Sequence, residues 1–242
     1  MKRTTSALAA VAAVALTMTA CGGGDESTTA IGGGGDLAPA ESGRCTEDKA
    51  GGTITMGEYS MLPTFDPGQG QYGVRGSAES AAVYDRLMRW DPATGEYEPK
   101  LAESLEANED STVWTLTLRD GVEFSNGDPL TAEDVAFTMG LHQDPATQAV
   151  TLTDATQVEE VTVIDPLTVE FSLSAPWAGF PLLLSGAAGE VIPKDAYTEA
   201  APGDWSLNPI GAGAFVVKSV TPDQELVLEH NPNYYGGPVC PT

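Results

Sequence analysis

The residue types that could perform chemistry are few and widely spaced in this 242-residue sequence. Its two histidines, His142 and His230, lack metal-ligand spacing, and each is interpreted as a surface or turn histidine. The acidic pairs at 133–134 and 159–160 could supply paired carboxylates, but we expect the first to complement a helix N-terminus and the second to face solvent at a strand start. The signatures Gly-x-Ser-x-Gly, Gly-x-x-x-x-Gly-Lys and His-Glu-x-x-His do not occur. The sequence therefore predicts a protein that is not an enzyme and has no cofactor or metal site.

The cysteines suggest export from the cell. Cys21 follows a basic start and the apolar run at 8–16, which is too short to span a bilayer comfortably. The residues before it resemble a bacterial lipobox, in which the cysteine carries lipid and becomes the mature N-terminus. Residues 1–20 are thus interpreted as a lipoprotein signal peptide, and the protein as lipid-anchored on the extracellular or periplasmic face of the cell membrane; the alternative is a plain secretory signal with a chance cysteine. Cys45 and Cys240 then remain, an even number in an oxidising compartment.

The composition excludes one class of partner and indicates a folded protein. With 11 Lys and Arg against 35 Asp and Glu, the net charge is −24, which repels phosphate backbones and argues against nucleic-acid binding. Hydrophobic residues make up 41% of the chain, enough to build a core. Residues 21–52 are rich in Gly, Ser, Thr and acidic residues, and are interpreted as a flexible tether with a reach of about 30 Å.

Hydrophobic periodicity predicts strands and helices mixed along the rest of the chain, and hence an α/β or α+β class. A helix is expected to begin at Thr131, with Asp134 completing a capping-box-like pair. The other expected elements are strands at 53–59 and 112–119, a helix at 77–88, a turn at 90–95, a hairpin of 158–164 with 167–173, a short helix at 180–184, and a second hairpin of 214–220 with 225–230.

Trp177 is the aromatic residue with the most suggestive surroundings. It stands in the segment Pro-Trp-Ala-Gly-Phe, and an aromatic residue beside Pro and Gly often lines a groove. Packing in the core is the other interpretation of the same pattern. Trp177 is therefore a candidate ligand-binding residue, with packing in the core as the alternative.

Several stretches occur in a recognisable order: LPTFDP, VYDRLMRWDPATGEYEPKLAESLE, STVWTLTLRDGVEFSNGDPLTAEDVAFTM, VTVIDPLTVEFSLSAPW, NPIGAGAFVV and NPNYYGG. In this order they resemble the family 5 extracellular solute-binding proteins, the peptide- and nickel-binding components of ABC importers. The resemblance covers about residues 53–239. The sequence departs from the family pattern at a few positions, with Leu105 and Tyr235 where Trp is usual, and Ala212, Ala214 and Phe215 where Thr, Pro and Tyr are usual.

The resemblance implies an α/β fold, a periplasmic-binding-protein-like (type II) first lobe with an inserted α+β subdomain. Residues 53–84 and 191–242 would belong to that lobe, and residues 85–190 would form the inserted subdomain. Family members are about twice this long, so the sequence resembles their N-terminal portion, with the second lobe absent from this chain. On this basis the folded part alone is expected to be marginally stable.

The resemblance also implies a function, the capture of peptides or similar small solutes outside the cell and their delivery to a membrane permease. The ligand-contacting loop of the family matches Tyr72, Gly73 and Val74, where glycine would permit close approach of the ligand to the main chain. Partners would be a peptide or small-molecule ligand, such as a nickel chelate or a sugar, and the permease subunits, with the protein itself a monomer. Alternatives are a sensory or chaperone-like lipoprotein on the same fold, a truncated remnant that binds nothing, or a secreted hydrolase, against which the absence of any nucleophile motif argues.

A disulfide between Cys45 and Cys240 is a further expectation from the resemblance. In the family fold the segments that carry these two residues flank the same lobe, and so could approach within disulfide distance. The alternative is that Cys240 pairs with a cysteine beyond Thr242.

Overall fold

A computed structural model describes residues 51–57, 62–66, 77–201 and 203–239. The signal peptide at 1–20, Cys21, Cys45, Cys240 and the loop residues 72–74 lie outside the described residues. No helix within the described ranges is long and apolar enough to cross a membrane.

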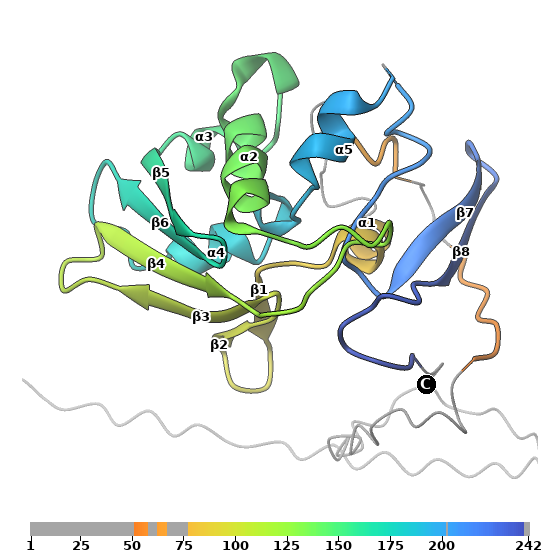
Figure 1. The fold of residues 1–242 in the computed structure, drawn as a ribbon, viewed down its shortest axis with the longest axis horizontal. Helices are drawn as coiled ribbons and strands as arrows, with labels where there is room; N and C mark the ends of the chain where they lie inside the picture. Colours follow the sequence, from red (N-terminus) through yellow and green to blue (C-terminus); the bar gives the residue numbers. More distant parts are fainter. Residues whose placement is uncertain (1–50, 58–61, 67–76, 202, 240–242) are drawn as a thin grey trace, which may run out of the picture. The chain divides into compact units, whose positions relative to one another are not determined.

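The largest sheet has four antiparallel strands in the order β3-β4-β6-β5 (Figure 1). Their bounds are Ala102–Ala107 for β3, Val113–Leu118 for β4, Val158–Asp165 for β5 and Thr168–Leu173 for β6. The predicted strand at 112–119 and the predicted hairpin around Asp165 are both confirmed. Strand β3 was not predicted.

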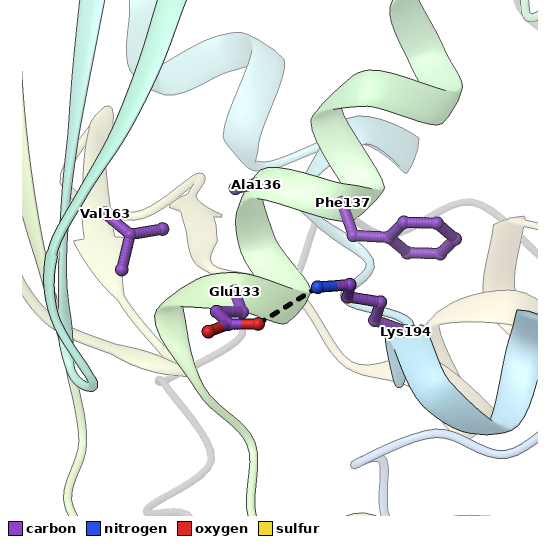
Figure 2. Close-up of a pocket in the computed structure, with 5 residues that line it drawn as sticks. All are labelled: Glu133, Ala136, Phe137, Val163 and Lys194. Carbon is purple, nitrogen blue, oxygen red and sulfur yellow. Dashed lines mark hydrogen bonds and ion pairs between the residues drawn. The ribbon is translucent and has the colours of Figure 1, made fainter.

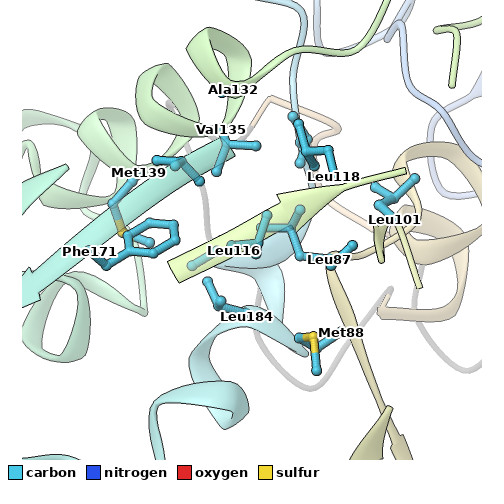
Figure 3. Packing of buried hydrophobic residues seen from close by; sticks show 14 of the residues in the cluster. Leu87, Met88, Leu101, Leu116, Leu118, Ala132, Val135, Met139, Phe171 and Leu184 are labelled. Carbon is cyan, nitrogen blue, oxygen red and sulfur yellow. The ribbon is translucent and has the colours of Figure 1, made fainter. Parts of the chain in front are cut away.

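One face of this sheet is apolar and is covered by helix α2, Ala132–Gln143. Alternate residues of β4 and β6 are buried, as the period of a strand requires. Figure 3 shows Ala132, Val135 and Met139 of α2 packed with Leu116 of β4 and Phe171 of β6. We call the buried cluster that contains these residues the first core.

The start of α2 follows the predicted capping pair. The Asp134 carboxylate accepts hydrogen bonds from the backbone N–H of Thr131 at 2.9 Å and from its hydroxyl at 2.8 Å. This satisfies a donor that the helix itself leaves unpaired. Glu133 and Asp134 lie in the first turn of α2, and Glu159 and Glu160 are exposed near the start of β5, as predicted.

The remaining elements are short. Helices are α1 (Ser77–Tyr84), α3 (Leu152–Ala155), α4 (Phe180–Leu184) and α5 (Lys194–Glu199), with 3-10 turns η3 (Pro145–Thr147) and η4 (Ala187–Gly189). Two hairpins join β1 (Met88–Asp91) to β2 (Glu96–Pro99), and β7 (Phe215–Thr221) to β8 (Glu225–His230). Each hairpin carries one cross-strand ion pair, Arg89 with Glu98 and Lys218 with Glu229. The predicted α4 and β7–β8 are confirmed.

A second core forms from segments that are far apart in the sequence. Its buried members are Phe65, Val83, Tyr84, Ile192 and Trp205. Partly buried apolar residues of the β7–β8 hairpin pack against it. The second core therefore joins α1, the segment before α5, the segment after α5 and the second hairpin.

Two predicted elements differ in the structure. Residues 53–57 of the expected strand at 53–59 form no strand, and Ile54 and Met56 are 59% and 70% exposed. An extended segment becomes a strand only when a neighbour accepts and donates its backbone hydrogen bonds. The helix expected at 77–88 ends at Tyr84, because Asp85 adopts a left-handed conformation with φ of 59° that breaks the helix.

Candidate functional site

The predicted ligand loop at 72–74 lies between two described segments, residues 62–66 before it and helix α1 after it. Both are held by side chains of the second core. We call Phe65, Asp66, Tyr84, Tyr197 and Trp205 the anchoring frame, because their hydrogen bonds fix the segment that leads into the loop.

Tyr84 and Trp205 form the centre of the frame. The Tyr84 hydroxyl donates to the carbonyl oxygen of Phe65, and the indole Nε1–H of Trp205 donates to the Tyr84 hydroxyl at 2.8 Å. Tyr84 is fully buried and Trp205 is 4% exposed. Buried polar tips need such partners, so the chain of bonds ties α1, residue 65 and residue 205 into one unit.

Asp66 is fixed by a side chain of α5 and by its own neighbour Thr64. Its Oδ1 accepts a hydrogen bond from the Tyr197 hydroxyl at 2.8 Å, and its backbone N–H donates to Thr64 Oγ1 at 2.9 Å. Thr64 in turn donates to the hydroxyl of Ser206 at 2.9 Å. Burial and, after it, the Asp66 carboxylate raise the pKa of the Tyr197 hydroxyl, which therefore remains a donor across the physiological range.

Helix α1 packs against the segment NPIGAGAFVV, residues 208–217. The backbone N–H of Gly213 donates to the carbonyl oxygen of Val83 at 2.8 Å. A Cβ atom on Gly211 would lie 2.2 Å from the Val83 carbonyl oxygen, and one on Gly213 would lie 2.3 Å from that of Ala82. Only glycine permits this approach of two backbones, so these two positions set the distance between α1 and the segment that precedes β7.

An open depression of about 430 Å³ lies on α2 beside β5 and the start of α5. Figure 2 shows its lining, with Glu133 and Lys194 joined by an ion pair at 3.0 Å beside Phe137. Phe137 also meets the ring of Tyr197 edge-on, with centroids 5.6 Å apart, so the depression borders the anchoring frame. Its charged pair is solvent-exposed, and its apolar lining is small, which makes it a weaker candidate than the frame.

Trp177 lies with the first core and not with the frame. Its indole is partly buried and meets Phe180 edge-on, with ring centroids 5.7 Å apart. Gly179 leaves room for the indole, because a Cβ atom there would lie 2.9 Å from Trp177 Nε1. Both interpretations of Trp177 thus have a physical basis, since one part of the ring packs on the core and another part faces solvent.

The prediction of a surface position for His142 is wrong. This residue is 1% exposed on the buried side of α2, where its Nδ1 pairs with Thr151 Oγ1 at 2.7 Å. Burial lowers the pKa of His142 to about 4, so the ring is neutral at physiological pH. His230 is exposed, as predicted. Within the described residues, no group of three or more His, Cys, Asp or Glu side chains could hold a metal ion.

Sequence reasoning missed the anchoring frame. Tyr197 lies on α5, which was not predicted, and Trp205 stands in a loop with no periodic pattern around it. The available signal was chemical, since both residues combine an aromatic ring with a polar tip that needs a partner when buried. The frame fixes residues 64–66 and Tyr84 through hydrogen bonds and aromatic packing.

Comparisons with known sequences agree with a binding role. Residues 96–240 match the family described as bacterial extracellular solute-binding proteins, family 5 Middle. The chain is 32% identical over 166 residues to the "Probable D,D-dipeptide-binding periplasmic protein DdpA" of Escherichia coli (strain K12), and this match covers 63% of the chain and 31% of the relative. The chain therefore spans about a third of the length of this curated relative.

Solved structures have the same fold over the matched part. The substrate-binding domain of an oligopeptide ABC transporter from Bacillus anthracis str. Ames superposes with a TM-score of 0.66 at 25% identity, over 74% of this chain and 37% of that one. A solute-binding protein from A. tumefaciens R10 in complex with mannopinic acid superposes with a TM-score of 0.63 at 30% identity, over 73% and 36%. The expected fold of periplasmic binding proteins is thereby confirmed for this part.

Proposed function

The chain belongs to the bacterial extracellular solute-binding proteins of family 5, and we propose that it is part of the solute-binding component of an ABC importer. In this role the protein captures peptides or similar small solutes outside the cell and delivers them to a membrane permease. It performs no catalysis. The observation that carries the proposal is the anchoring frame, which fixes the chain on the N-terminal side of residues 67–76 within a fold shared with solute-binding proteins.

The proposed ligand contacts are Tyr72, Gly73 and Val74, with Trp177 as an additional aromatic contact. Gly73 would allow the ligand close to the main chain, Val74 would offer its N–H and C=O groups, and Tyr72 would provide an aromatic wall. The frame supports this assignment because a loop that binds through its backbone needs fixed ends.

Binding by the full-length protein tests these contacts, with a defined mixture of di- and tripeptides as the probe. Replacement of Gly73 by Val is expected to weaken binding at least about tenfold, because a branched side chain blocks close approach to the main chain. Gly57→Val is the matched control, since a Cβ atom there meets nothing within 4 Å. Equal affinities for the Gly73 variant and the control would exclude the assignment of this loop.

Trp177 is tested separately by its fluorescence. If the indole contacts the ligand, its emission changes on addition of the peptide mixture, and Trp177→Ala weakens binding with a small loss of stability. Loss of stability with unchanged affinity would assign Trp177 to the core alone.

We further propose that Cys21 carries the lipid anchor and that Cys45 and Cys240 form a disulfide. Cys21→Ser is expected to release the protein into the medium or to block its processing; a variant that is processed normally and stays on the membrane would refute the anchor.

Peptide mapping without reductant tests the disulfide, which a free Cys45 thiol would rule out.

The proposed division places 53–84 and 191–242 in one body and 85–190 in another. The membership of the two cores supports it, since the buried residues of the second core all come from the first body, and most of those of the first core come from 85–190.

A further inference from the structure

Two buried carboxylates lie where the chain passes between the two cores. Asp85 follows α1 and is 1% exposed, and Glu190 follows η4 and is 3% exposed. The backbone also crosses here, since the N–H of Leu87 donates to the carbonyl oxygen of Gly189 at 2.9 Å. We call this region, which joins residues 80–87 to residues 185–190, the junction.

Every carboxylate oxygen of Asp85 has a partner. Its Oδ1 pairs with Lys100 Nζ at 2.6 Å and accepts from the backbone N–H of Arg86 at 2.8 Å. Its Oδ2 accepts from the Tyr235 hydroxyl at 2.9 Å. A buried carboxylate with this many donors has its hydrogen-bonding needs met inside the fold.

Glu190 is bonded unevenly. Its Oε1 accepts three hydrogen bonds, from Ser80 Oγ at 3.0 Å, from Arg86 Nε at 3.0 Å and from Arg86 Nη2 at 2.9 Å. Its Oε2 is buried and has no hydrogen-bond partner among the described residues. An ionised carboxylate spreads its charge over both oxygens, so half of that charge would lie in a site with no donor.

A neutral carboxyl group fits this geometry better than a carboxylate. With the proton on Oε2, the other oxygen is a carbonyl that accepts the three bonds. What is left without a partner is then a neutral hydroxyl, whose burial costs less than that of a charged oxygen. The nearby Asp85 carboxylate also repels a second negative charge. In agreement, burial raises the pKa of Glu190 from its ordinary 4.5 to about 7, although Arg86 opposes the shift.

We propose that Glu190 is a proton-dependent latch: the junction is closed while Oε2 carries a proton, and release of that proton to solvent favours an open junction in which water reaches Oε2. The opening would separate residue 80 and Arg86 on one side from Glu190 on the other. This role is independent of the identity of the ligand, because it concerns only how the two cores are joined.

The charged and titratable groups around the latch come from four elements. Asp85 and Arg86 face Glu190 from the end of α1, while Lys100 and Tyr235 face Asp85 from the segment after β2 and from the C-terminal segment. His142 of α2 faces Ala187 in the η4 turn that leads to Glu190. His142 titrates near pH 4 and Glu190 near pH 7, so between pH 5 and 7 a change at the junction reports Glu190.

Amide hydrogen exchange of the full-length protein tests the latch at the Leu87 N–H, after correction for the pH dependence of intrinsic exchange. Opening that is coupled to loss of one proton makes the protection of this amide fall by up to about tenfold per pH unit between pH 5 and 7, and level off above pH 7. The amide of Leu116 in the first core should keep its protection. A parallel fall at Leu116 would mean global unfolding and would overturn the latch.

Glu190→Gln keeps the shape of the side chain but cannot ionise, and it should make the protection of Leu87 independent of pH. Glu160→Gln, an exposed carboxylate on β5, is the matched control and should behave like the unchanged protein. If Glu190→Gln retains the pH dependence, the proposal is wrong.

If Glu190→Gln fails to fold, infrared spectroscopy of the unchanged protein tests whether Glu190 is protonated at pH 5. The carbonyl stretch of a buried protonated carboxyl group should be present at pH 5 and lost through about pH 7; its absence at pH 5 would refute the latch.

Discussion

The first core joins side chains that alternate along neighbouring strands, whereas the second core joins Tyr84 to a tryptophan 121 residues further along the chain. The first contains mostly aliphatic and phenyl side chains whose burial needs no polar partner. In the second, the polar tips of Trp205, Tyr84 and Tyr197 are hydrogen-bonded to another aromatic tip, to the backbone and to the Asp66 carboxylate, respectively. The difference indicates separate tasks, with the first core supplying stability and the second fixing the position of one segment.

Deleting a large side chain from the first core should have the largest effect on stability. Phe171 is fully buried, and Phe171→Ala is expected to cost about 3–5 kcal/mol of unfolding free energy. Ligand affinity of the remaining folded protein should not change. Urea unfolding with a parallel binding assay measures both, and a large loss of affinity would contradict the separation of tasks.

Acid should distinguish the buried histidine of α2 from the junction. The pKa of His142 falls from 6.5 to about 4 in the folded state, so the unfolded chain binds this proton first, and stability is lost as pH falls from 6.5 to 4. The full loss is about 3 kcal/mol. Glu190 has the opposite sign, because its raised pKa makes stability decline as pH rises from 4.5 to 7.

These two contributions offset each other, so the unchanged protein should have a nearly flat stability between pH 4.5 and 6.5. In Glu190→Gln the unfolding free energy should rise with pH, because only the His142 contribution remains. The additional change His142→Asn should remove this pH dependence. Urea midpoints across this pH range provide the measurement. A flat profile for Glu190→Gln alone would show that His142 does not titrate as its burial requires.

Removing one hydroxyl from the frame should give a smaller loss of stability and a change in binding. Tyr84→Phe removes two buried hydrogen bonds, those that join the Tyr84 hydroxyl to the Phe65 carbonyl oxygen and to the Trp205 indole N–H, at a cost of about 1–3 kcal/mol. Affinity for the peptide mixture should fall as well, because the segment before the ligand loop loses its anchor. Tyr97→Phe on the β1–β2 hairpin is the control and should leave affinity unchanged.

The smallest effect is expected at the depression on α2. Glu133→Gln breaks an ion pair whose side chains are largely exposed, and such pairs contribute little to stability. The urea midpoint and the affinity should both match those of the unchanged protein. A measurable loss of affinity would indicate that the ligand contacts this depression, and would contradict the assignment of the site to the loop beside the frame.

The first core could largely be predicted from the sequence because its pattern is local. Strand β4, the β5–β6 hairpin and the start of α2 follow from alternation and a capping pair within a few residues. Strand β3 was missed, because Ala-Glu-Ser-Leu-Glu-Ala has the composition of a helix, and its pairing with β4 determines its conformation.

The second core could not be predicted in the same way. The hydrogen bond between Trp205 and Tyr84 depends on tertiary contacts that no short window contains. The burial of His142 was missed for a related reason, since a histidine near the end of α2 has the same local pattern whether or not another segment covers it. The polar members of a buried cluster are specified by distant partners and not by periodicity.

The ion pairs have a consequence for the response of the protein to ionic strength. They engage Arg89, Lys100, Lys194 and Lys218, while the chain as a whole has 35 acidic against 11 basic residues. Much of the remaining surface charge is therefore mutually repulsive carboxylate. Counter-ions at about 0.15 M salt screen such repulsion beyond about 8 Å, whereas the paired groups are in direct contact and are screened less. Moderate salt should accordingly compact and stabilise this domain, the opposite of what is expected for a fold that depends on attraction between exposed charges.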